Sequence, residues 1–291
     1  MKYRHLLLTF LKLGPLTPLL AGLLAASSPA LAAGGAAGDQ SAQPGAQLQV
    51  ALTLYAGGIS FGKMDMDATL RGSDYRTVSN FQTSGAVSAF WQSEIQATSS
   101  GKIGAKSLEP GLYDSYDINR TGKKQEVSLT YENGSPRLYA DPVYSTTGYE
   151  VKPNELKNTM DPLSALTFIV SGVAADGGNP CALTAPVFDG RRLYNIEMTK
   201  VKDTDIKMDN GLYAGKATQC QIRYRPLAGM KPRVLKSGES FPVINAWVVN
   251  YPSGVAGRSF AVPVRVWADT QYGQLSVVAN SIKIDGQAPK S

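Results

Sequence analysis

The residues that could carry out acid–base, nucleophilic or metal chemistry are few in this chain of 291 residues. Its one histidine is His5, and its two cysteines are Cys181 and Cys220. Because His5 lies in an N-terminal segment that we expect to be removed, Ser-His-Asp catalysis, Cys-His catalysis and histidine metal sites are excluded. Two cysteines are also too few for a four-cysteine zinc site or an iron–sulfur cluster. We therefore expect a protein that is not an enzyme and has no catalytic residues, no metal and no cofactor.

Carboxylates are the remaining groups for general acid–base catalysis, as in glycoside hydrolysis on a β-sheet scaffold. The acidic residues considered are Asp65, Asp67, Asp114, Asp117, Asp203 and Asp205. None has a recognisable catalytic spacing, and none begins a calcium-binding EF-hand loop, which needs a following glycine and a distal glutamate. Ser99-Ser100-Gly101-Lys102 matches Ser-x-x-Lys, but we expect it in a polar turn with no helix behind it. A carboxylate-dependent glycan hydrolase stays as an alternative function.

Two neighbouring arginines, Arg191 and Arg192, follow the turn-forming pair Asp189-Gly190. Planar guanidinium groups suit carboxylate or phosphate, so one interpretation is a clamp for an anionic ligand. The other, which we favour, is an exposed hairpin whose arginines pair with nearby acids. The tyrosines present a similar choice between lining a ligand site in a concave sheet and filling the core of that sheet. These tyrosines are Tyr113, Tyr116, Tyr131, Tyr139 and Tyr144.

The first 32 residues have the three parts of a secretory signal peptide. A basic start precedes a leucine-rich stretch, and residues 30–32 supply a small-x-small cleavage site. The alternative is a membrane anchor. Pro15 and Pro18 interrupt the apolar run, however, and the apolar stretch after Pro18 is shorter than the roughly 20 residues that a membrane-spanning helix needs. We expect export to the periplasm and no membrane-spanning segment after cleavage.

Cleavage after residue 32 lowers the formal net charge from +6 to +3, because it removes Lys2, Arg4 and Lys12. The rest of the chain has no run of more than two basic residues, so we expect no nucleic-acid partner. Residues rich in Ala, Gly, Ser, Gln and Pro then predict a flexible leader. The expected organisation is a leader over residues 33–47, a single β-rich domain over 48–285 and a tail over 286–291.

Cys181 and Cys220 are expected to form one structural disulfide, since export places them in an oxidising compartment. Closing a loop of about 40 residues stabilises the folded state by about 4 kcal/mol in the chain-entropy model. A redox-active pair would need a closer spacing, such as C-x-x-C. Pairing between two chains is the remaining alternative. We expect the bridge to fasten the segment after a predicted helix to the C-terminal part of the sheet.

Most of the chain after the leader alternates apolar and polar residues with the period of a β-strand. Val127, Leu129 and Tyr131 share one face of a predicted strand, and Asn133-Gly134 fits the two-residue turn of a hairpin. Further predicted strands cover residues 49–55, 75–82, 86–91, 191–201, 262–268 and 275–279. The sequence therefore predicts an all-β fold built on a single large antiparallel, strongly curved sheet of β-spiral or half-barrel type.

One segment departs from the strand pattern. Asp161 suits a helix N-cap, Pro162 suits the first helical position, and Gly172 suits the residue after the end. Apolar residues recur at helical spacing between them, so we predict a short helix over residues 162–171 that covers or plugs the sheet. The candidate residues for a ligand site or for this helix plug are Leu163, Leu166, Ile169, Arg191 and Arg192.

Several short motifs occur in a particular order along the chain. They are Asp161-Pro162-Leu163-Ser164-Ala165-Leu166, Cys181, Phe188-Asp189-Gly190-Arg191-Arg192, Tyr213-x-Gly215, Cys220, Pro226-Leu227-Ala228-Gly229 and Pro263-Val264-Arg265-Val266. Over about Leu48 to Ile284 the set resembles domain-of-unknown-function family 3108 of proteobacterial periplasmic proteins. The resemblance implies a secreted β-rich protein, similar in style to envelope-integrity proteins that fold as a long wrapped β-spiral with one disulfide. It implies no catalytic residues.

We therefore expect a soluble periplasmic, non-enzymatic protein that supports cell-envelope integrity. A curved sheet would bind a lipid, an acyl ligand or an envelope protein on its concave side. One alternative is a lipid or lipoprotein carrier of half-barrel type, with an open apolar cavity under the helix. Another is the glycan hydrolase, which needs converging carboxylates about 5 to 9 Å apart. An outer-membrane barrel is disfavoured by the predicted helix, the long disulfide loop and the polar tail.

Overall fold

The computed structural model describes residues 45–89, 92–119, 122, 124–173, 178–232, 241–271 and 273–289. The predicted signal peptide and most of the predicted leader lie outside these residues. Strand β1 begins at Ala46, so the last two residues of the predicted leader belong to the sheet.

Thirteen strands, one α-helix and two short 3-10 helices make up the described part of the chain. The strands are β1 (Ala46–Ala56), β2 (Ile59–Arg71), β3 (Asp74–Thr83), β4 (Ser93–Ile103), β5 (Leu108–Asn119), β6 (Lys124–Glu132), β7 (Ser135–Asp141), β8 (Leu183–Phe188), β9 (Leu193–Lys207), β10 (Ala214–Ala228), β11 (Ile244–Pro252), β12 (Ser259–Thr270) and β13 (Gly273–Ile284). The helices are η1 (Gly85–Ala89), η2 (Pro153–Glu155) and α1 (Pro162–Val170).

All thirteen strands join in one antiparallel sheet of order β7-β6-β5-β4-β3-β2-β1-β13-β12-β11-β10-β9-β8. Strand β1 pairs with both β2 and β13, so the first and last strands of the described residues meet in the middle of the sheet. The sheet is not closed, because β7 and β8 at its two ends do not pair with each other. The predicted fold class, one open and curved antiparallel sheet with a single α-helix, is confirmed.

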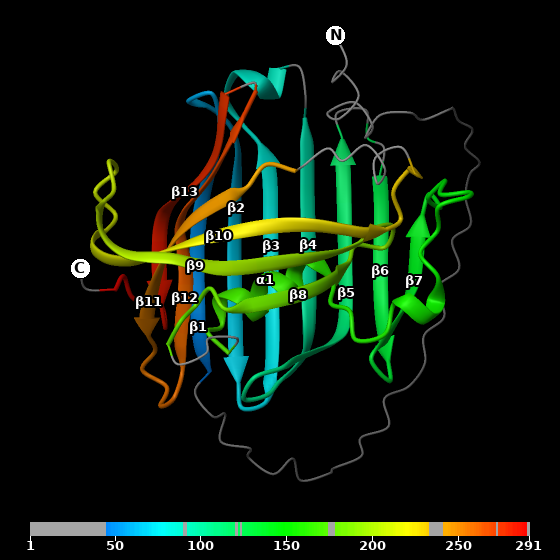
Figure 1. Cartoon of the computed structure of the whole chain (residues 1–291), viewed down its shortest axis with the longest axis horizontal. Helices are drawn as coiled ribbons and strands as arrows, with labels where there is room; N and C mark the ends of the chain where they lie inside the picture. Colours follow the sequence, from blue (N-terminus) through cyan, green and yellow to red (C-terminus); the bar gives the residue numbers. More distant parts are fainter. Residues whose placement is uncertain are drawn as a thin grey trace, which may run out of the picture. The chain divides into compact units, whose positions relative to one another are not determined.

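The sheet curls so that two parts of it face each other across α1. In Figure 1, β2 to β7 run side by side, while β8, β9 and β10 cross in front of them. Helix α1 contacts β3, β4 and β5 on one side and β8 and β12 on the other, so it lies between the two layers. Register shifts, such as those between Ala51 and Leu52 and between Ser100 and Gly101, add local bends.

Apolar and polar residues alternate along the strands, so the apolar side chains gather on one face of the sheet, which is buried. Leu48 of β1 lies opposite Ala68 of β2, Val50 lies opposite Met66, and all four are buried. Their polar neighbours face the other side of the sheet. Full burial of each leucine or valine side chain contributes about 1.5–3 kcal/mol, so this face supplies much of the driving force for folding. A smaller buried cluster surrounds Leu163 at the start of α1.

Helix α1 forms as its end signals predict and ends one residue earlier than expected. The Asp161 side chain accepts a hydrogen bond from Ser164 N at 2.7 Å, Pro162 starts the helix, and Gly172 follows its end at φ +67°. Among the described residues, no helix combines the length and apolar content needed to cross a membrane.

The predicted strand over residues 86–91 is wrong. Residues 85–89 form the 3-10 helix η1 between β3 and β4, and residues 90 and 91 lie outside the described part. Gly85 begins this turn at φ +68°, in the left-handed region that glycine tolerates best. Residues 86–89 of the predicted strand therefore belong to a turn that connects two strands.

Candidate functional site

A cluster of hydroxyl groups lies buried beneath the N-terminus of α1. The Asp161 carboxylate accepts hydrogen bonds from Ser164 Oγ and, at 3.3 Å, from Ser99 Oγ of β4. Ser99 Oγ and Ser164 Oγ are 2.6 Å apart, and Tyr75 Oη of β3 is 2.6 Å from Ser164 Oγ. All four residues are almost completely inaccessible to solvent. The cluster therefore ties the helix to the inner face of β3 and β4.

Burial also shapes the ionisation of this cluster. Desolvation raises the pKa of Asp161 from 3.8 to about 6, although hydrogen bonds from Ser164 and Ser99 oppose the shift. Desolvation and the neighbouring Asp161 raise the pKa of the Tyr75 phenol to about 12. Tyr131 lies close by, and its pKa is raised by the same two causes. The carboxylate thus has hydroxyl and amide partners and a helix N-terminus, rather than a cation.

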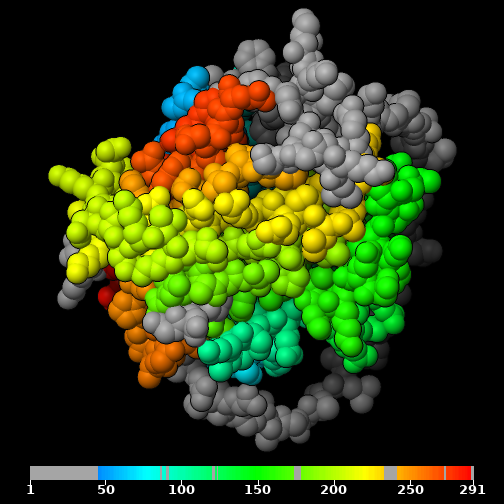
Figure 2. Space-filling view, viewed as in Figure 1, coloured from blue at the N-terminus to red at the C-terminus, as the bar shows by residue number. Residues whose placement is uncertain are grey.

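Serine, tyrosine and aspartate together could in principle carry nucleophilic chemistry, but here they are enclosed. The hydroxyls are satisfied by each other, and the strands β9 and β10 form a continuous band across this side of the structure (Figure 2). A nucleophile must be within reach of its substrate. We therefore assign this cluster to positioning α1.

An open groove lies at the β7 end of the sheet, and its volume is ≈ 310 Å³. Its lining comes from β7, the segment after β7, and the β8–β9 turn. The lining residues are Leu138, Ala140, Val143, Tyr144, Thr146, Glu150, Val151, Phe188, Gly190 and Arg191. We call this the arginine groove, because most of its side chains are apolar and Arg191 is the only cation among these lining residues. Val143 is 85% exposed, which is unusual for an apolar side chain of a folded protein.

The β8–β9 turn gives its two arginines different roles. Asp189 Oδ1 accepts hydrogen bonds from the backbone N–H groups of Arg191 at 3.0 Å and Arg192 at 2.6 Å. Asp189 Oδ2 pairs with Arg192 Nε at 2.7 Å, so the Arg192 charge is neutralised within the turn. The Arg191 guanidinium instead lies 6.0 Å from the centre of the Tyr144 ring. Its buried Nε atom has no hydrogen-bond partner among the described residues.

Two glycines allow the β8–β9 turn to pack closely against its neighbours. Gly190 has φ +88°, and a Cβ atom there would lie 2.8 Å from Val127 and 3.1 Å from Leu138. Gly229, at φ +77°, follows β10, and a Cβ atom there would lie 2.1 Å from the carbonyl oxygen of Arg191. Only glycine permits both the backbone angles and this close approach. These two positions hold Arg191 against the rim of the arginine groove.

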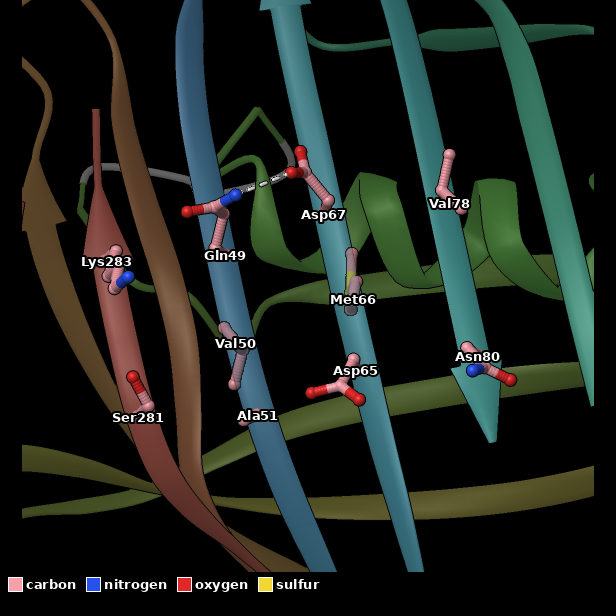
Figure 3. Close-up of a pocket in the computed structure, with 10 residues that line it drawn as sticks. All are labelled: Gln49, Val50, Ala51, Asp65, Met66, Asp67, Val78, Asn80, Ser281 and Lys283. Atoms are coloured by element: carbon pink, nitrogen blue, oxygen red, sulfur yellow. Dashed lines mark hydrogen bonds between the residues drawn. The ribbon is translucent and has the colours of Figure 1, made fainter. Parts of the chain in front are cut away.

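A second depression, of ≈ 370 Å³, lies on the outer face of β1, β2, β3 and β13. In Figure 3, the polar side chains Gln49, Asp65 and Asp67 lie on the near side of these strands, and α1 lies behind the sheet. One of its two acids already has partners, since Asp67 accepts hydrogen bonds from Gln47 Nε2 and, at 2.8 Å, from Gln49 Nε2. No group of three or more His, Cys, Asp or Glu side chains in the described part could hold a metal ion. This depression is a polar surface of the sheet.

The three candidate residues of the helix belong to the core. Leu163 is buried in the smaller cluster with Phe188 and Leu193, and Leu166 packs partly buried against both clusters. Ile169 packs partly buried against the main core. Of the two candidate arginines, Arg191 lines the groove and Arg192 is held by Asp189. The favoured interpretation, that both arginines pair with acids, therefore fits Arg192 and not Arg191.

Asp65 and Asp67 both line the outer depression, but the candidate carboxylates of different strands are not brought together. Asp65 and Asp67 lie on β2, whereas Asp114 and Asp117 lie on β5, with β3 and β4 between them. Asp117 accepts a hydrogen bond from Ser93, and Asp203 accepts hydrogen bonds from Lys200 and Thr218. Asp205 lies on β9, on the same strand as Asp203.

The segment Ser99-Ser100-Gly101-Lys102, which matches Ser-x-x-Lys, does not form the predicted turn. Residues 99–102 lie in strand β4 and not in a turn, because they continue the ladder with β3 and β5. Ser99 is buried against α1, while Lys102 pairs with Asp74 at 2.5 Å on the surface. The sequence interpretation missed Ser99, because a serine on a strand has the same signature whether it faces a helix or solvent.

The disulfide between Cys181 and Cys220 is present, with the two Cα atoms 5.6 Å apart. Cys181 precedes β8 and Cys220 lies within β10, so the bridge joins the segment after α1 to a strand two places along the sheet. The five candidate tyrosines do not line one site. Tyr144 lines the arginine groove and Tyr113 is buried, whereas Tyr116 and Tyr139 are exposed and Tyr131 packs against the smaller cluster.

The family model described as "Protein of unknown function (DUF3108)" matches residues 50–280. The chain belongs to this family. Among solved structures, this DUF3108 protein is similar to a β-barrel-like protein of domain of unknown function DUF1849 from Brucella abortus. That similarity has 15% sequence identity and a TM-score of 0.46, and covers 82% of this chain and 97% of the other. No curated protein matches the DUF3108 chain.

Proposed function

We propose that this DUF3108 protein is a non-enzymatic periplasmic protein that supports cell-envelope integrity by holding an anionic amphiphile in the arginine groove. The acyl chain would lie along Leu138, Val143 and Val151, and the acid group would pair with Arg191. A volume of ≈ 310 Å³ lies at the lower end of the range for small-molecule sites, which suits part of one chain.

The observation that carries this proposal is the Arg191 guanidinium, which lies in apolar surroundings and has no acidic partner in the described part of the chain. A charge that is partly removed from water is costly unless it is paired. Asp189 is occupied by Arg192, and the Glu150 carboxylate of the same groove accepts the backbone N–H of Gly148. A ligand carboxylate or phosphate would supply the missing partner for Arg191, and the exposed Val143 would gain apolar cover.

Two features support location in the periplasm. The chain starts with a segment that has the form of a signal peptide. In addition, its two cysteines are joined, and disulfides persist in oxidising compartments. Fractionation of cells that carry the full chain tests this location, and detection of the protein with residue 1 intact in the cytoplasm would contradict it.

Two observations favour groove binding over the alternatives. The space between the layers of the sheet holds Leu163, Phe168 and Val170 of α1, all buried, where a half-barrel carrier would need an open tunnel. The acids Asp65 and Asp114 lie on strands separated by two others, where a glycan hydrolase would need them to converge on one cleft.

Calorimetric titration with dodecanoate and with dodecanol tests the proposal, because the two probes share a chain and differ in charge. We expect dodecanoate to bind at least about tenfold more tightly, since a charge-assisted hydrogen bond contributes about 1.5–3 kcal/mol. Arg191→Gln should remove that difference, whereas the matched control Arg76→Gln, on the outer face of β3, should retain it. Dodecyl phosphate distinguishes a phosphate from a carboxylate headgroup. Equal binding of both probes, or none, would contradict the proposal.

A further inference from the structure

Strand β7 is an open edge of the sheet, and its backbone hydrogen-bonding groups are divided between two sides. Asn133 and Gly134, at φ 51° and 76°, form a two-residue hairpin turn between β6 and β7. In such a hairpin the flanking pair, here Glu132 and Ser135, exchanges both backbone bonds, and the following pairs alternate. The backbone groups of Pro136, Leu138 and Ala140 therefore point away from β6.

These outward groups have no backbone partner in the described part of the chain. The segment after β7 returns to the turn, where Asn158 N donates to Gly134 O at 2.7 Å, but it makes no backbone hydrogen bond to residues 135–141. Leu138 and Tyr139 are 44% and 55% exposed. Figure 1 shows β7 as the last strand of its row. An unpaired edge with exposed apolar side chains is a template for a further strand.

The sequence of β7 is complementary to itself when two copies run antiparallel with Tyr139 at the centre. Leu138 of one copy then lies opposite Ala140 of the other, and both residues have outward backbone groups, so four interchain hydrogen bonds can form. In the same register Arg137 lies opposite Asp141 of the second copy, twice by symmetry. Pro136 lies opposite Pro142, and neither has an N–H group, so the ladder ends there.

Arg137 can change its partner from Glu132 to Asp141 of a second copy. It now pairs with Glu132 at 2.8 Å, with side chains 75% and 52% exposed. Such surface pairs contribute little to stability, so exchanging Glu132 for Asp141 of a second copy has a small cost. Registers shifted by two residues lose the opposite-charge pairs and bring a proline into the ladder.

We propose that β7 is a homodimerisation edge, through which two copies of this chain pair antiparallel about Tyr139 and form one continuous sheet. The interface is isologous, as expected of a two-fold dimer. Leu138 and Ala140 lie on the side of β7 that lines the arginine groove, so the two grooves would be neighbours across the new seam. The dimer does not depend on the amphiphile.

Sedimentation equilibrium of the disulfide-bonded mature chain tests this proposal over a wide range of concentration. We expect a monomer–dimer equilibrium for the native chain. Arg137→Asp and Asp141→Arg, each alone, should raise the dissociation constant at least about tenfold, since like charges then face each other. An equimolar mixture of the two variants should restore a dimer, because opposite charges face each other again.

A backbone variant gives a second, independent measurement. Ala140→Pro removes an outward N–H group and no bond to β6, so the fold should persist by circular dichroism while dimerisation is lost. Arg76→Gln, which alters the charge of β3 but not of β7, should leave dimerisation unchanged. A native chain that stays monomeric at all concentrations would overturn the proposal. A dimer that Ala140→Pro leaves intact, or a variant mixture that fails to restore it, would overturn it as well.

Discussion

The side-chain oxygens of Thr77 and Thr167 lie 2.7 Å apart, and neither residue is accessible to solvent. Thr77 belongs to β3 and Thr167 to the middle of α1. Since the Thr167 hydroxyl donates to Leu163 O at 2.8 Å, the proton between the two threonines comes from Thr77. This pair of hydroxyl groups thus links the helix to a strand that lies 90 residues earlier in the sequence. The pair lies beside the Asp161 cluster.

Replacing these threonines by valine should have unequal effects. Thr167→Val leaves the Thr77 donor buried without an acceptor, so we expect a loss of about 1–3 kcal/mol in the free energy of unfolding. Thr77→Val leaves only an acceptor lone pair unused and should cost less. The double variant should be close to the native chain, because both polar groups are gone. Urea denaturation of the four proteins measures the coupling, and strictly additive losses would contradict it.

Asp161 should make the protein less stable as pH rises through the acidic range. Its folded pKa, raised to about 6 by burial, exceeds the ordinary value of 3.8, so the folded state holds the proton more tightly than the unfolded state. The group's contribution is fully favourable below pH 3.8 and is lost as pH rises to about 6, a change of roughly 3 kcal/mol. Asp161→Asn should abolish this component of the pH dependence.

Asp203 supplies the control for that experiment. Hydrogen bonds from Lys200 and Thr218 lower the pKa of Asp203, so its contribution has the opposite sign and is lost as pH falls. Denaturant titrations between about pH 3.5 and 7 compare native, Asp161→Asn and Asp203→Asn proteins. Parallel stability curves for the native and Asp161→Asn proteins would show that burial leaves this carboxyl unperturbed.

Removal of the disulfide should be strongly destabilising. Cys181 and Cys220 are 39 residues apart in sequence and fully buried, so replacing both by alanine should lower the free energy of unfolding by about 4 kcal/mol. The native protein in reductant should approach the double variant, and reductant should not affect the double variant further. Equal stability of oxidised and substituted proteins would contradict the assigned role.

Gly229→Ala should disturb the turn that carries Arg191. Its Cβ atom would lie 2.1 Å from the Arg191 carbonyl oxygen, in addition to the strain of φ +77°. Gly178→Ala is the matched control, because φ is +85° there and no atom of the described residues lies within 4 Å of the added Cβ. For the control we expect the free energy of unfolding to fall by about 1–2 kcal/mol from backbone strain alone. For Gly229→Ala we expect a larger loss. Dodecanoate affinity should fall only in Gly229→Ala.

Local patterns were enough to predict several of the elements. Alternation placed the strand around Leu129, and Asp161 with Gly172 marked the ends of α1. The strand expected at residues 86–91 was wrong because a short, mostly apolar run is also compatible with a turn, and the positive φ of Gly85 favours the turn. Patterns that extend over few residues therefore need the neighbouring backbone before they can be interpreted.

The candidate site was less accessible to sequence reasoning. The sequence offered Arg191 and Arg192 as a possible anion clamp and favoured an exposed hairpin instead. Leu138, Val143 and Val151 join Arg191 only because β7 and the β8–β9 turn meet at one end of the curled sheet. Likewise, nothing in the local sequence of Ser99 indicates that it faces Asp161, which lies 62 residues further along the chain. Such sites arise from contacts between distant segments, which period and spacing do not encode.

The pairing of β1 with β13 has a consequence for how the molecule is made. A sheet whose central seam joins its first-synthesised strand to its last cannot be completed until residue 284 has left the ribosome, so β1 must wait with one side unpaired. The high contact order of this sheet predicts slow folding. The unpaired edge of β1 would need protection from aggregation until β13 is available. Because Leu48 lies opposite Ile284, a circularly permuted gene that joins residue 289 to residue 45 should shorten the wait without altering the sheet.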